Sequence, residues 1–106
     1  MTKYTRADIL DTAKQYVTKQ RENEHGEMEA NFKMIGDLWG TYLERKINPN
    51  DVAVMMTLLK IARIKSNPRS GDNWIDSCGY MSCGGELSAK KPEPEVKAVK
   101  FQGGNV

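Results

Sequence analysis

Three groups of polar residues have types and spacing that suit chemistry on a nucleotide. They are the acids Glu24 and Glu27 with Asn31 close behind, the bases Lys60 and Arg63, and the trio Asp72, Asp76 and Tyr80. Mg²⁺ prefers oxygen ligands and usually keeps water and substrate phosphates in its shell. Because a helical bundle can place carboxylates of different helices opposite each other, the four acids are candidate ligands for one or two Mg²⁺ ions.

The other members of these groups suit recognition of the nucleotide itself. We expect Lys60 or Arg63 to meet phosphate charge. We expect Asn31 or Tyr80 to orient the base or the sugar. A metal-activated water would then attack a phosphoanhydride, which is the scheme of a nucleotide pyrophosphohydrolase. No single residue is assigned a catalytic role on this basis.

Each group also has a purely structural interpretation. Glutamates near a helix start interact favourably with the helix dipole and often form a solvated face. Lys60 and Arg63 can pair with aspartates of the next helix, Asp72 and Asp76, across a short turn. Cations on an apolar helix need such a partner or a route to water. A buried amide must be hydrogen-bonded, so Asn31 can cap a neighbouring helix end. Both interpretations stay open at this point.

The elements that must position these residues are four helices, which predicts an all-α fold. Thr5 and Asp8 have the spacing of a capping box, and apolar residues then recur at three and four positions from Ile9 to Val17. We expect this helix to end at Gly26. A second amphipathic helix is predicted over about 27–45, and a fourth over about 72–87. Short connections between such helices favour a four-helix antiparallel bundle.

The third predicted helix begins at Asn48-Pro49, where asparagine suits the N-cap and proline the first helical position. Its run 52–64 is apolar almost all round and is interrupted by Lys60. This pattern is typical of a central helix that is covered on several sides. We therefore expect this helix to form the middle of the bundle.

Length and charge limit the possible functions. With 106 residues the chain has room for one domain, which we place at 1–87. The segment 88–106 contains prolines, lysines and little to bury, so we expect a disordered tail. The net charge of +2 comes from this tail, which leaves the body charge-balanced. A balanced body makes nucleic acid an unexpected partner.

Apolar runs and cysteines indicate the compartment. No apolar run approaches the roughly 18 residues of a membrane span, and the N-terminus lacks the apolar stretch of a secretory signal. We therefore expect a cytosolic protein without a membrane partner. Cys78 and Cys83 lie about 140° apart on a helix, so they cannot both face one metal ion. We expect reduced thiols, with at least one packed in the core.

A set of motifs between residues 9 and 87 resembles a known family. The motifs are Arg21-x-x-Glu24-His25-Gly26, Asn31-Phe32, Leu38-Trp39-x-x-Tyr42-Leu43, the block 51–63, Asn67-Pro68 and Asp72-x-Trp74-Ile75-Asp76-x-x-Gly79-Tyr80. Together they resemble a domain of unknown function found mainly in tailed phages and prophages. The resemblance implies a phage origin and a role in the cytoplasm of an infected host.

More remotely, the chain is similar to phage nucleotide-modification-associated domains and to all-α nucleoside triphosphate pyrophosphatases of the MazG kind. Those enzymes hold Mg²⁺ with E-x-x-E and E-x-x-D pairs on the helices of a dimerising bundle. Glu24-x-x-Glu27 has the first spacing, although Gly26 interrupts it. Asp72-x-x-x-Asp76 departs from the second spacing and lacks its glutamate. The resemblance therefore implies binding more firmly than catalysis.

Three functions follow from these observations. The favoured one is a small phage binding protein that binds a nucleotide or a host protein, in counter-defence or host takeover. The second is a Mg²⁺-dependent, MazG-like pyrophosphohydrolase. The third is a structural protein that self-associates through Trp39 and Tyr42. Because a chain this short buries a modest core, we expect a homo-oligomer in each case.

Overall fold

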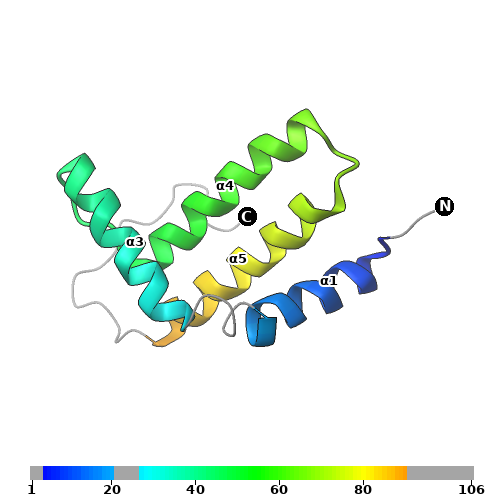
Figure 1. Cartoon of the computed structure of the whole chain (residues 1–106), viewed down its shortest axis with the longest axis horizontal. Coiled ribbons are helices and arrows are strands. Elements are labelled where there is room, and N and C mark those ends of the chain that lie inside the picture. Colours follow the sequence, from blue (N-terminus) through cyan, green and yellow to red (C-terminus); the bar gives the residue numbers. More distant parts are fainter. Residues whose placement is uncertain (1–3, 21–26, 91–106) are drawn as a thin grey trace, which may run out of the picture.

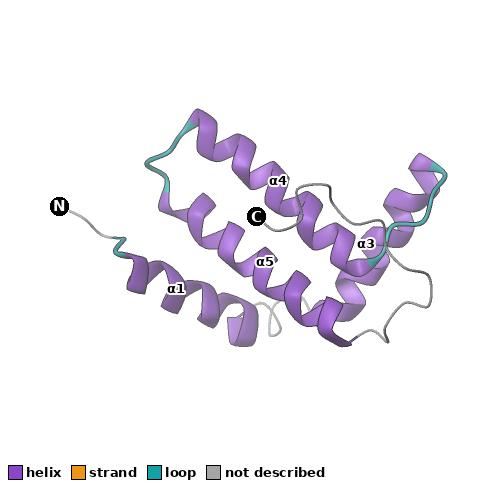
Figure 2. Ribbon diagram, turned by 180° about the vertical axis from the view of Figure 1, so that it is seen from behind, coloured by secondary structure: helices purple, strands orange, loops and turns teal. Residues whose placement is uncertain are grey.

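The computed structural model describes residues 4–20 and 27–90, and this part of the chain is helical and contains no strand. The all-α prediction is therefore confirmed. Figures 1 and 2 show α1 (Arg6–Gln15) with its π-helical extension η1 (Tyr16–Gln20), α3 (Met28–Leu43), α4 (Pro49–Ser66) and α5 (Gly71–Lys90). The predicted end at Gly26 and residues 91–106 of the predicted tail lie outside the described residues.

Local hydrogen bonds explain where the helices begin. The backbone N–H of Asp8 donates to Thr5 Oγ1 at 3.1 Å, and the Thr5 N–H donates to Asp8 Oδ2 at 3.2 Å. This reciprocal pair confirms the capping box. At the start of α4, the Asn48 N–H donates to Asp51 Oδ2 at 2.9 Å, and Pro49 occupies the first turn. Both helix starts are therefore set by residues close in sequence.

Helix α5 continues to Lys90, three residues beyond its predicted end. The pair Gly84-Gly85 does not stop it, because Gly84 is buried at the crossing of α5 with α4. A Cβ atom at Gly84 would lie 3.0 Å from the Ala53 Cβ. Gly84 therefore allows α4 and α5 to pack closely. In the sequence alone, the pair Gly84-Gly85 instead suggests a helix end.

The helices α4 and α5 form an antiparallel hairpin, and α1 lies along α5 in the same direction (Figure 1). Tyr4 contacts the start of α5 at Gly71, and Val17 contacts it further along at Gly79, which establishes the parallel direction. Helix α3 crosses the first half of α4 (Figure 2). The antiparallel arrangement thus holds for the hairpin, while α1 runs parallel to α5.

The core lies along α5, and the expectation that the third predicted helix would be the covered, central one is wrong. Helix α5 packs against α4, α1 and η1. The most buried large side chains are Ile75 of α5 and Val52 of α4. On the side of α4 away from α5, Val54, Leu58 and Ile61 are 47%, 58% and 52% exposed. Nothing in the described part of the chain covers this side.

Candidate functional site

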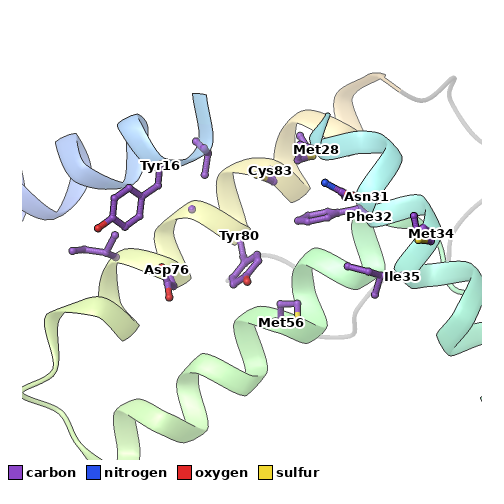
Figure 3. A pocket seen from close by; sticks show the side chains of 13 residues that line it. Tyr16, Met28, Asn31, Phe32, Met34, Ile35, Met56, Asp76, Tyr80 and Cys83 are labelled. Carbon is purple, nitrogen blue, oxygen red and sulfur yellow. The ribbon is translucent and has the colours of Figure 1, made fainter. Parts of the chain in front are cut away.

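A pocket of about 310 Å³ lies between η1, α3, α4 and α5 (Figure 3). Its lining is dominated by apolar and aromatic side chains, including three methionines and three aromatic rings. The only amide or carboxylate side chains among the described lining residues are those of Asn31 and Asp76. A mostly apolar cavity with a few polar groups, at the lower end of the ~300–1,000 Å³ range, is typical of small-ligand sites.

Two aromatic rings from different helices lie side by side in the pocket lining. Phe32 on α3 and Tyr80 on α5 have ring centroids 6.2 Å apart and planes inclined by 34°. Figure 3 shows both rings between α3, α4 and α5, with Met56 of α4 nearby. A tilted pair at this distance is favourable for the two rings, and its faces offer stacking surface to a flat guest.

A largely buried ion pair lies at the edge of the pocket. Lys60 Nζ on α4 is 2.9 Å from Asp76 Oδ2 on α5, and the two side chains are only 12% and 15% exposed. Asp76 lines the pocket, whereas Lys60 reaches its partner from outside the lining. The pair links the two helices of the hairpin. The described lining residues include no lysine or arginine.

A second ion-paired group joins the far end of α5 to α3. Lys90 Nζ lies 3.3 Å from Glu86 Oε2 and 3.6 Å from Glu29 Oε1. The hydrogen bond with Glu86, its charge and the charge of Glu29 raise the pKa of Lys90 above its ordinary value. These side chains are more than half exposed, so they contribute little to stability, but they place the start of α3 beside the end of α5.

Residues 8–88 match the family model of the domain of unknown function DUF6378. The chain belongs to this family. It is 42% identical over 73 residues to the gene 55 protein of Mycobacterium phage L5. The aligned residues make up 68% of this chain and 47% of the relative. It is 39% identical over 75 residues to the gene 55 protein of Mycobacterium phage D29, which covers 71% and 50% respectively.

These relatives place the DUF6378 domain among phage-encoded proteins of unknown function. The chain spans about half the length of the curated relatives it matches. No solved structure matches it. The resemblance to a phage domain is confirmed, while the remote similarity to MazG-type enzymes and to nucleotide-modification domains stays a prediction.

In the DUF6378 domain, the structure brings together four of the predicted site residues. Asn31, Asp76 and Tyr80 line the pocket, and Lys60 joins them through its ion pair with Asp76. The expected structural pairing of a helix-three cation with a helix-four aspartate is therefore present. Arg63 is exposed and does not line the pocket.

The predicted metal ligands are not gathered in the described part of the DUF6378 domain. Glu27 is exposed at the start of α3, which lies beside the end of α5. Asp72 is exposed in the first turn of α5, and a helix of this length spans roughly 30 Å. Residues 4–20 and 27–90 contain no group of three or more metal-ligating side chains. Glu24 lies outside the described residues, so a Mg²⁺ site that includes it stays a prediction.

Sequence reasoning missed most of the pocket lining. Met28, Phe32 and Ile35 have the three- and four-residue spacing typical of a helix face that packs in a core, yet they border a cavity. Tyr16 lines the pocket from the π-helical segment η1. A π-helical turn changes the direction in which the following side chains point, and the apolar pattern of the sequence does not indicate such a turn. The expectation of a thiol packed in the core is confirmed, because Cys83 is buried and Cys78 half-buried, and neither forms a disulfide. No helix within the described residues has the length and hydropathy needed to cross a membrane.

Proposed function

We propose that the DUF6378 domain binds a flat heteroaromatic molecule of the nucleobase or nucleoside type, as a binding protein in the infected host cytoplasm. The observation that carries this proposal is the 310 Å³ pocket whose lining includes the neighbouring rings of Phe32 and Tyr80. Stacking on aromatic faces is a general way for proteins to hold bases. The pocket supplies that surface together with two polar side chains.

The polar groups fit the edge of a base. Asn31 offers an amide that both donates and accepts, and Asp76 offers carboxylate oxygens that accept from an N–H group. Two such groups in an otherwise apolar pocket supply orientation and selectivity, while the apolar lining supplies most of the burial. This division of roles suits a heterocycle with exocyclic N–H or carbonyl groups.

The described lining contains a carboxylate and no lysine or arginine, so we do not expect it to bind phosphates inside the pocket. Lys60 is paired with Asp76, and Arg63 is exposed and is not among the lining residues. The described lining therefore offers no cation to a triphosphate. We expect the base and sugar to supply the affinity and the phosphates to remain at the mouth or in solvent.

Calorimetric titration of the purified chain with nucleosides and their triphosphates tests the proposal. We expect saturable binding of at least one base type, with nucleoside and triphosphate affinities within about tenfold of each other. If no member of the panel binds, the proposal is wrong. If triphosphates bind and release pyrophosphate when Mg²⁺ is added, the pyrophosphohydrolase prediction replaces it.

Replacing Asn31 with leucine tests the orientation of the ligand. The change keeps the side-chain volume but removes the amide, so we expect roughly tenfold weaker binding from the loss of one or two hydrogen bonds. Asn67→Leu, at an exposed position in the α4–α5 turn, is the matched control and should leave affinity unchanged. Equal affinities in the two variants would place the ligand elsewhere.

A further inference from the structure

We propose that two copies of this chain associate through the exposed face of α4, in an antiparallel pair centred on Leu58. The face, which we call the α4 stripe, consists of the exposed residues Val54, Leu58, Ile61 and Lys65 and of the half-buried Asp51, whose carboxylate also caps the helix. These positions are separated alternately by three and four residues, so they form one line along the helix. It lies on the side of α4 away from α5.

The apolar side chains of the α4 stripe are not covered by any other described helix. Val54, Leu58 and Ile61 are about half exposed, although they lie on a helix whose other sides pack against α3 and α5. Among the described residues the core is small, and its most buried large side chains are Val52, Ile75 and Leu87. A short chain with a small core gains stability when a second copy covers such a face.

The charges at the two ends of the α4 stripe select a second copy in the antiparallel direction. Asp51 lies at its first position and Lys65 at its last, with Leu58 halfway between them. When two copies run in opposite directions about Leu58, each Asp51 lies near the partner's Lys65, and the apolar middle positions meet. Parallel pairing would place like charges together at both ends, which is unfavourable.

The area available suits a modest interface. A single helix face is a small interface, at the lower limit of the ~1,000 Å² in total that a specific contact needs. Association in the micromolar range is therefore expected, because buried area at this lower limit leaves little surplus after the entropic cost of pairing. The α4 stripe lies on a different face from the pocket described above.

Sedimentation equilibrium of the full chain over a range of concentrations tests the proposal. We expect a monomer–dimer equilibrium in the wild type. Leu58→Glu places two carboxylates at the centre of the pair and should weaken association at least ~100-fold. Met81→Glu introduces the same charge at an exposed position of α5 and should dimerise like the wild type. A wild type that stays monomeric, or two variants with equal association, would overturn the proposal.

Cysteine cross-linking tests the direction of the pair. Under mild oxidation, a mixture of Val54→Cys and Ile61→Cys chains should form a mixed disulfide faster than either chain forms one alone, because the antiparallel register brings these positions together. Mass spectrometry separates mixed from self-linked products. The wild type, which carries Cys78 and Cys83, is treated in the same way to give the background. Preferential self-linking of each variant would contradict the antiparallel register.

Discussion

Replacing Lys60 with methionine should lower the free energy of unfolding by about 2–3 kcal/mol. Methionine keeps the length of the side chain but removes the charge that lies 2.9 Å from Asp76. The Asp76 carboxylate, only 15% exposed, then stays in a poorly solvated place without its cationic neighbour. Breaking a fully buried pair costs about 3–5 kcal/mol, and the residual exposure here lowers that value.

Urea unfolding at one fixed protein concentration measures this effect, since association would add a concentration-dependent contribution. Lys33→Met is the matched control, because the Lys33–Asp37 ion pair is 69% and 64% exposed. It should cost less than about 0.5 kcal/mol. The double variant Lys60→Met/Asp76→Leu should recover much of the loss, since it removes both charges. Equal losses in Lys60→Met and Lys33→Met would show that the buried pair does not hold the hairpin.

Replacing Gly36 with alanine should cost about 2–3 kcal/mol, although alanine is the better helix former. A Cβ atom at Gly36 would lie 2.5 Å from the carbonyl oxygen of Ile47 and 3.4 Å from Val52 Cγ2. The first of these neighbours is backbone, which cannot rotate away. The connection between α3 and α4 must therefore shift, and the pocket wall formed by α3 shifts with it.

Gly85→Ala is the control for Gly36→Ala, because both glycines are helical but nothing lies within 4 Å of a Cβ atom at Gly85. There we expect stabilisation of about 0.5–1 kcal/mol from helix propensity alone. Thermal unfolding followed by circular dichroism should give opposite signs for the two variants. A stabilised Gly36→Ala protein would mean that α3 does not approach the α3–α4 connection as closely as the structure places it.

The candidate site illustrates why its residues were only partly predictable. Asn31, Lys60, Asp76 and Tyr80 stood out because polar residues on apolar helix faces need partners. Which of them would meet depended on contacts between α3, α4 and α5, and these join residues more than 15 positions apart. Arg63 is one turn from Lys60 and equally polar, yet it is exposed. No local pattern separates these two cations.

The amino-acid sequence by itself determined the helices and most of their ends, because capping residues and apolar periodicity act between positions a few residues apart. Thr5 with Asp8 and Asn48 with Asp51 are of this kind. The tertiary structure alone decided that α5 is the central helix, that α4 keeps an exposed face, and that part of the apolar stripe of α3 borders a cavity. The physical reason is that burial depends on which helices approach each other, and Gly36 and Gly84 set that approach through contacts with distant residues.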